Sequence, residues 1–216
     1  MSIADRISSI ELRDLLLSLA ALVVAFSVLM NGPRIPNLQT IVIITVGVGT
    51  GFLLHEMAHK FVALHFGYFA EYRANQMGLL FAVAASFAGF IFAAPGAVMI
   101  SKPTATAEFY MQDSFGQEDL RREIKKETLW ISLAGPMTNI ILTAFFFLAL
   151  LSVPSSGTVA LAANFALFIN LTFAAFNLLP FGPLDGKKIF DSNRKVWLLV
   201  GLPTIMLALP VYFGMI

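Results

Sequence analysis

Residues 55–59, His-Glu-Met-Ala-His, form an HExxH motif inside a long apolar stretch. On a helix, residues i and i+4 lie on one face one turn apart, so His55 and His59 can bind one zinc ion. Glu56 is then placed to act as general base towards water at the metal. A carboxylate deep in an apolar stretch is costly without a function, which favours an active site over a histidine–glutamate cluster that satisfies its own hydrogen bonds.

A catalytic zinc site usually has three protein ligands, and two residues are candidates for the third. His65 follows His59 by six residues, but position 62 is valine rather than a glycine that could bend the helix. His65 would therefore lie about 9 Å further along the helix axis, and we interpret it as an ordinary residue near the helix end. Asp185 follows the helix-breaking residues 180–183, Pro-Phe-Gly-Pro, and can turn inward; a turn or helix cap is its alternative role.

The HExxH motif and the later pattern NxxPxxPLDG at residues 177–186 together resemble the site-2 protease family of intramembrane zinc metalloproteases. Residues 134–139, Ala-Gly-Pro-Met-Thr-Asn, are similar to the AGPxxN segment of that family. The resemblance implies one zinc ion per chain and a second catalytic residue that contacts substrate or stabilises the oxyanion. Carried onto this sequence, the zinc ligands are His55, His59 and Asp185, the base is Glu56, and the second catalytic residue is Asn177.

The composition predicts an all-α polytopic membrane protein. Of 216 residues, 58% are hydrophobic and only 12% are charged, and the net charge of +1 gives no basis for binding nucleic acid. The absence of cysteine excludes disulfides and thiolate ligands. A helix needs about 20 apolar residues to cross the hydrocarbon core. About six hydrophobic elements are expected, at residues 15–30, 38–66, 77–100, 129–153, 159–179 and 196–216.

The distribution of lysine and arginine predicts the orientation of these elements. Basic residues cluster before the first element, between the third and fourth, and between the fifth and sixth. The positive-inside rule then places the N-terminus in the cytoplasm. This arrangement requires that residues 77–100 do not cross, so we expect a re-entrant element there. The resemblance to the site-2 protease family implies that it contains short β strands. His55 lies about 25 Å along its helix from Leu38, which places the site in the cytoplasmic half of the bilayer.

These observations predict one membrane-embedded metalloprotease domain over residues 1–216, without a PDZ or CBS domain. The expected function is hydrolysis of peptide bonds within transmembrane segments of membrane-anchored proteins at the cell membrane, as in regulated intramembrane proteolysis. The partners are then a transmembrane protein substrate and the lipid bilayer. The alternatives are a membrane metal transporter, an inactive metal-binding homologue, and a peptidase with an enclosed chamber. The first and last elements, expected to make few buried polar contacts, are candidates for a gate through which the substrate enters.

Overall fold

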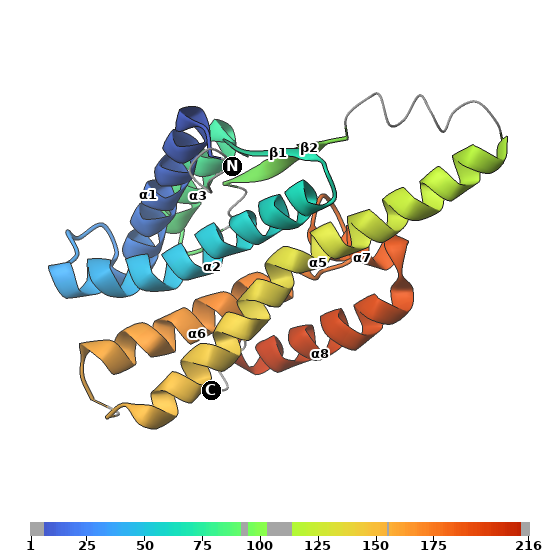
Figure 1. Cartoon of the computed structure of the whole chain (residues 1–216). Helices are drawn as coiled ribbons and strands as arrows, with labels where there is room; N and C mark the ends of the chain where they lie inside the picture. Colours follow the sequence, from blue (N-terminus) through green and yellow to red (C-terminus); the bar gives the residue numbers. More distant parts are fainter. Residues whose placement is uncertain (1–6, 92–94, 103–113, 155, 213–216) are drawn as a thin grey trace.

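The computed structural model describes residues 7–91, 95–102, 114–154 and 156–212. Its elements are helices and the two strands of one small sheet, which lie in the first half of the chain with a short helix between them (Figure 1). They are α1 (Ser9–Asn31), α2 (Leu38–His65), β1 (Phe69–Ala74), α3 (Gln76–Phe87), β2 (Gly96–Ser101), α5 (Ser114–Ser152), α6 (Thr158–Asn177), α7 (Asp185–Ser192) and α8 (Arg194–Tyr212).

Four helices of the described chain are long and apolar enough to cross a membrane: α1, α2, α6 and the Glu118–Ser152 part of α5. With the shorter apolar helix α3 and the proline-containing α8, they confirm an all-α polytopic membrane protein with about six hydrophobic elements. Residues 118–128, which are rich in charged side chains, are also helical. They are continuous with the fourth element, because no glycine or proline separates them from it.

The chain between α2 and α5 has the geometry expected of a re-entrant element. Strands β1 and β2 pair antiparallel, and the register sets Ala74, the last residue of β1, opposite Gly96, the first of β2. The N–H of Asn75 also donates to the carbonyl of Pro95 at 2.9 Å. The chain therefore leaves and returns at one point, and between them α3 has 12 residues, a length of about 18 Å against about 30 Å of hydrocarbon. One detail differs from the expected bounds, in that β1 precedes residue 77, and residues 76–87 between the two strands are helical.

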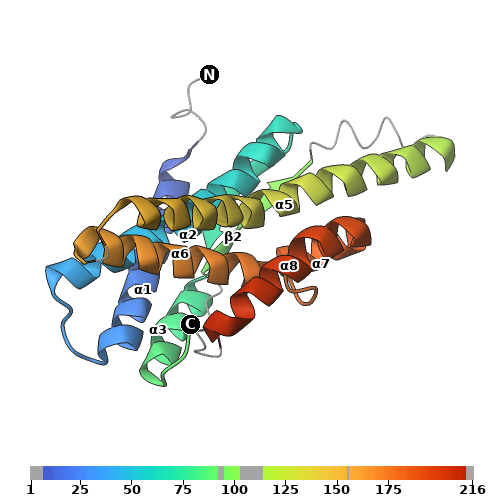
Figure 2. The same cartoon turned by 90° about the horizontal axis from the view of Figure 1, so that it is seen from below.

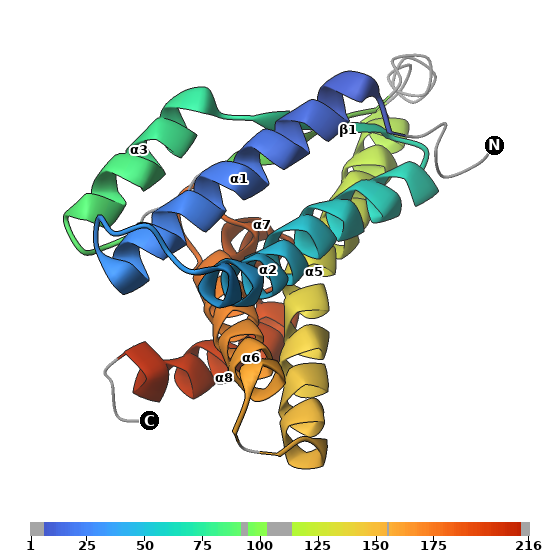
Figure 3. The same ribbon diagram turned by 90° about the vertical axis from the view of Figure 1, so that its left-hand side faces the viewer.

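Helix α2 lies at the centre of the molecule (Figures 2 and 3). Gly47 and Gly51 face α6 so closely that a Cβ on either would contact its aromatic side chains, Phe165 and Phe173. This GxxxG pair lets the two backbones approach. Helices α1 and α3 lie together on one side of α2 (Figure 3), whereas α7 packs against α5, and α8 packs against α6 and α7. The metal-binding motif on α2 therefore faces neighbours on several sides.

Candidate metal centre and active site

His55, His59 and Asp185 come together in the interior of the protein. The Nε2 atoms of the two histidines are 3.1 Å apart. Oδ2 of Asp185 lies 2.9 Å from Nε2 of His59 and 3.5 Å from Nε2 of His55. All three side chains are buried, and among the described residues they are the group whose ligand atoms could hold a metal ion. Residues up to 130 positions apart in the sequence thus present three donor atoms to one point.

The donor set fits zinc in chemistry and in spacing. Imidazole nitrogen and carboxylate oxygen are common zinc ligands, and bonds of about 2.0–2.1 Å in a tetrahedral site set the ligand atoms about 3.3 Å apart. The three measured separations lie on both sides of that value. Three electron-rich atoms this close together repel one another unless a cation or a proton lies between them. The geometry therefore fits a three-ligand zinc site.

Asp185 reaches this position because the chain breaks sharply after α6. Gly182 has a φ of 60°, a left-handed conformation that favours glycine. Gly186 packs so tightly that a Cβ there would overlap the carbonyl of Leu178. Asp185 is the first residue of α7, and its carboxylate interacts with the histidines and, at 3.1 Å, with Lys188. The contacts of Asp185 are thus those of a ligand candidate rather than those of a helix cap.

The charges around Asp185 keep its carboxylate ionised. Burial by itself would raise the pKa of Asp185. The attraction of His59 and of Lys188 outweighs burial and holds the pKa of Asp185 well below its usual value. An ionised carboxylate is the form that binds a metal cation.

Helix α5 provides the polar partners of the Nδ1 atoms of His55 and His59. Nδ1 of His59 lies 2.6 Å from the backbone carbonyl of Ile131, and Nδ1 of His55 lies 2.5 Å from Oδ1 of Asn139. Gly135, between these two positions on α5, faces the rings directly. A Cβ at Gly135 would lie 2.6 Å from Nε2 of His55 and closer still to Nε2 of His59. Glycine is therefore required where α5 passes the metal site.

Glu56 and Asn177 are the two candidate catalytic residues, and of the two it is Glu56 that interacts with the donor group. Glu56 is partly buried, and its carboxylate interacts with His55, with Asp185 and with the backbone amide of Val98 in β2. Asn177 is the last residue of α6, and its amide donates to the carbonyl of Phe173 at 3.0 Å. The side-chain amide has two N–H groups, so this bond engages one of them.

His65 lies away from the centre. It is the exposed last residue of α2, and its ring contacts Phe66 with a centroid separation of 5.4 Å. It is not part of the donor group among the described residues.

The sequence reasoning missed the roles of Ile131, Gly135 and Asn139, although it singled out residues 134–139 as a motif. The three positions are spaced by four, which places them on one face of a helix. That spacing, with a glycine between an apolar and an amide residue, was the available signal. The spacing could not show that this face of α5 packs against the turn of α2 that carries His55 and His59.

The arrangement described so far, a zinc site carried on apolar membrane helices with an adjacent glutamate, is that of a membrane-embedded zinc metalloprotease. The model of peptidase family M50 matches residues 43–165, which include the HExxH motif and residues 134–139. Asn177 and Asp185 lie beyond this match. The chain therefore belongs to peptidase family M50, the family of the site-2 proteases.

Two relatives, both named "Putative zinc metalloprotease", support this assignment. MJ0611 of Methanocaldococcus jannaschii is 35% identical over 203 residues, which cover 93% of each chain. YwhC of Bacillus subtilis is 30% identical over 179 residues, which cover 72% of this chain and 70% of the relative. No solved structure matches the chain significantly. The protein is a zinc metalloprotease and a multi-pass membrane protein, and membrane proteins in general are the substrates of its family.

Proposed function

We propose that this protein hydrolyses peptide bonds within transmembrane segments of membrane-anchored proteins, as in regulated intramembrane proteolysis. The observation that carries the proposal is the position of the donor group. His55, His59 and Glu56 lie within α2, a helix of 28 residues that is long and apolar enough to span the bilayer. A peptide bond can reach a site at that depth if it belongs to a segment that is itself in the membrane.

In this proposal His55, His59 and Asp185 bind one zinc ion per chain, within a single membrane-embedded metalloprotease domain. Zinc, when bound, acts as a Lewis acid towards the scissile carbonyl and the attacking water. Glu56 accepts the proton of that water and delivers it to the leaving amine. Asn177 donates its second N–H to the oxyanion of the tetrahedral intermediate, a contact whose loss typically lowers the rate by about 10²–10³.

The same proposal places the N-terminus in the cytoplasm and the active site in the cytoplasmic half of the bilayer. Helix α2 runs for about 25 Å from Leu38 to His55 but only about 15 Å from His55 to its end at His65. The re-entrant element keeps both ends of residues 75–95 on one side, so that α5 starts on the side where α2 ends. The basic residues flanking these helices then lie in the cytoplasm.

A transmembrane substrate helix must unwind locally before its carbonyls can reach the site, because its own hydrogen bonds engage them. Substrates with glycine, proline or polar residues near the cleaved bond should therefore be cut faster than those with uninterrupted leucine.

The alternative of a metal transporter requires a polar path through the bilayer. Two further buried acids, Glu11 and Asp14, lie near the start of α1, where they bond to Lys60 and to the sheet.

Zinc content and cleavage, measured together on purified full-length protein, test the proposed function. Wild type should hold about one zinc ion and cut a membrane-anchored substrate in proteoliposomes. Glu56→Gln should keep zinc and lose cleavage, because the amide cannot accept the proton. Asp185→Ala should lose most zinc, whereas His65→Ala is the matched control and should retain it. Cleavage by Glu56→Gln at the wild-type rate, or zinc loss in His65→Ala but not Asp185→Ala, would contradict the assignment.

Cysteine labelling tests the proposed orientation, since the chain has no native cysteine. A cysteine at Ser156, between α5 and α6, should react with an impermeant reagent added from outside the cell. A cysteine at Lys187, near the start of α7, should react only after the cytoplasmic side is opened. The reverse pattern would overturn the orientation without affecting the assignment of the zinc ligands.

A further inference from the structure

A chain of two buried asparagine amides lies behind His55. Asn139 of α5 and Asn170 of α6 are both fully buried. Nδ2 of Asn170 donates to the carbonyl of Ala166 at 2.8 Å. Nδ2 of Asn139 donates to Oδ1 of Asn170 at 3.0 Å and to the carbonyl of Gly51 at 2.9 Å. Oδ1 of Asn139 then faces Nδ1 of His55 at 2.5 Å.

The direction of every hydrogen bond in this chain is set by two backbone carbonyls, which can only accept. The carbonyl of Ala166 requires the NH2 group of Asn170 to face it, which turns Oδ1 of Asn170 towards Asn139. The carbonyl of Gly51 and this Oδ1 then require both N–H groups of Asn139. Rotating the amide of Asn139 by 180° would set its oxygen against two acceptors, so Oδ1 must face His55.

The consequence for His55 is a single tautomer. Since Oδ1 of Asn139 can only accept, Nδ1 of His55 must carry the proton. Nε2 then has a free lone pair, and it is the atom that faces His59 and Asp185. We propose that Asn139, oriented by Asn170, is the positioning residue that fixes His55 in its Nδ1–H tautomer and aims Nε2 at the zinc ion. This inference rests on the proposed function, in that His55 is taken as a zinc ligand.

His59 needs no orienting side chain, whereas His55 does. Its Nδ1 faces the carbonyl of Ile131, which is an acceptor in any orientation. His55 lies one turn earlier on α2 and faces an amide, which could present either an acceptor or a donor. Asn170 removes that ambiguity. A carboxylate in place of Asn139 would accept equally well, but its charge would be fully buried next to two oxygen acceptors.

The experiment compares Asn139→Leu and Asn170→Leu with a matched control, Asn164→Leu, which removes an exposed amide from the same helix as Asn170. Zinc affinity is measured by competition with a chelator on purified full-length protein. Loss of a partner that orients a metal-bound histidine typically weakens metal binding about 10–100-fold. We expect a loss in that range for Asn139→Leu, a smaller loss for Asn170→Leu, and none for Asn164→Leu.

Nitrogen NMR of histidine-labelled protein supplies a readout that a purely structural role would not change. The chain has three histidines, so the side-chain signals can be assigned by single substitutions. In metal-free protein, His55 should be the Nδ1–H tautomer in wild type and a mixture in Asn170→Leu, with His59 unchanged. Because Asn170→Leu retains Asn139, it carries the test even if Asn139→Leu fails to fold.

The proposal is overturned if folded Asn139→Leu binds zinc like wild type, or if His55 keeps one tautomer in folded Asn170→Leu. A failure of the proposed zinc assignment looks different, because His55→Ala itself would then retain zinc. Loss of zinc in His55→Ala together with normal zinc binding in Asn139→Leu would leave the zinc site intact and refute only the role of Asn139.

Discussion

His59 and Lys60 are adjacent in α2 but point into two different kinds of buried environment. His59 faces α5, where its polar partner is a neutral backbone carbonyl. Lys60 faces α1 and forms an ion pair with Glu11, and the two side chains are 1% and 0% exposed. On the α5 side, neutral hydrogen-bonding groups determine which ring nitrogen of each histidine carries the proton. On the α1 side, an ion pair joins α1 to α2.

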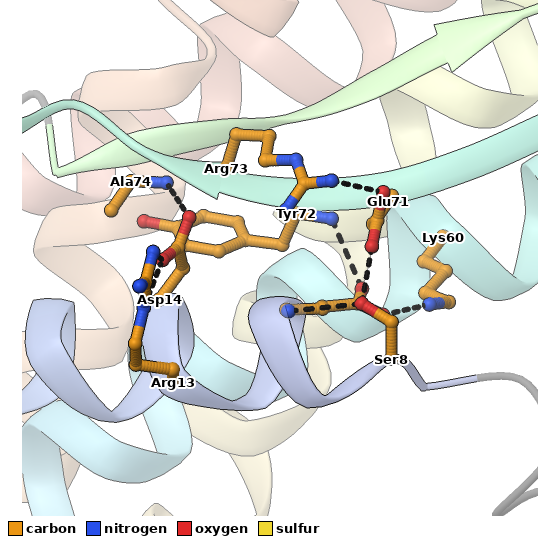
Figure 4. A network of polar contacts seen from close by, with 9 residues as sticks. Ser8, Arg13, Asp14, Lys60, Glu71, Tyr72, Arg73 and Ala74 are labelled. Atoms are coloured by element: carbon orange, nitrogen blue, oxygen red, sulfur yellow. Dashed lines mark hydrogen bonds and ion pairs between the residues drawn. The ribbon is translucent and has the colours of Figure 1, made fainter.

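The charged side extends from α2 to the small sheet (Figure 4). Glu11 also accepts from the N–H of Tyr72 at 3.0 Å, and Asp14 accepts from the N–H of Ala74 at 3.2 Å. These amides lie on β1, which pairs with β2 along its other edge. The two carboxylates of α1 therefore satisfy the edge of β1 that would otherwise be unpaired.

The hydroxyl of Tyr72 continues this contact further along α1. It donates to Oγ of Ser18 at 2.9 Å, and Ser18 donates to the carbonyl of Pro95 at 3.3 Å. The expectation that the first hydrophobic element makes few buried polar contacts is therefore wrong. Helix α1 is bonded to α2, to β1 and to the residue before β2, so it belongs to a unit with the sheet. A gate that requires α1 to separate from the sheet would break all of these bonds.

We expect the largest effect on zinc binding from the addition of one methyl group to α5, at Gly135. Gly135→Ala should abolish most zinc binding, because its Cβ would overlap Nε2 of both His55 and His59. The loss of affinity should exceed the about 10–100-fold typical of residues behind the ligands. Chelator competition on purified protein measures it. The fold should persist, since alanine is a better helix former than glycine.

Gly49→Ala is the matched control for Gly135→Ala. The Cβ of an alanine at position 49 would have Leu19 as its nearest neighbour at 4.0 Å, an ordinary contact, and α2 carries both this position and the histidines. Zinc affinity should remain at the wild-type value. Equal zinc binding by wild type and Gly135→Ala would show that α5 does not pass the metal site as closely as described.

The parts of the fold and of the candidate site also differ in how far the sequence could predict them. His55, Glu56 and His59 were recognisable because their spacing lies within one helix. Asp185 is distant in sequence, and its assignment needed both the break after residue 179 and the resemblance to a family. The re-entrant element followed from the charge distribution, since only one arrangement of the helices satisfied it.

What could not be predicted depends on contacts between distant parts of the chain. Asn139 lies 84 residues from His55, and Ile131 lies 72 residues from His59. Periodicity identifies the face that these residues share but not the helix against which it packs. The partners of β1 could not be predicted for a similar reason, because its edges are satisfied by β2 and by carboxylates about 60 residues earlier. The sequence of β1 alone gives only a short, weakly alternating pattern.

The smaller expected effect, on the charged side, concerns stability rather than zinc. Lys60→Met should lower the free energy of unfolding by about 3–5 kcal/mol, because Glu11 is then a buried carboxylate without its counter-ion. Unfolding of purified protein in detergent measures the change. The matched control is Lys187→Met, which breaks an exposed pair with Asp191 and should cost only about 0.3–0.5 kcal/mol.

The double variant Glu11→Gln with Lys60→Met separates charge from shape. It removes both charges but keeps a side-chain oxygen that can accept from the N–H of Tyr72, so most of the stability lost in Lys60→Met should return. Zinc affinity of the folded double variant should match wild type, since neither side chain belongs to the donor group. If the double variant is no more stable than Lys60→Met, the buried charge is not the cause of the loss. If it also loses zinc while it remains folded, the ion pair on the α1 side of α2 affects the zinc site on the α5 side. The two sides of α2 are then not independent.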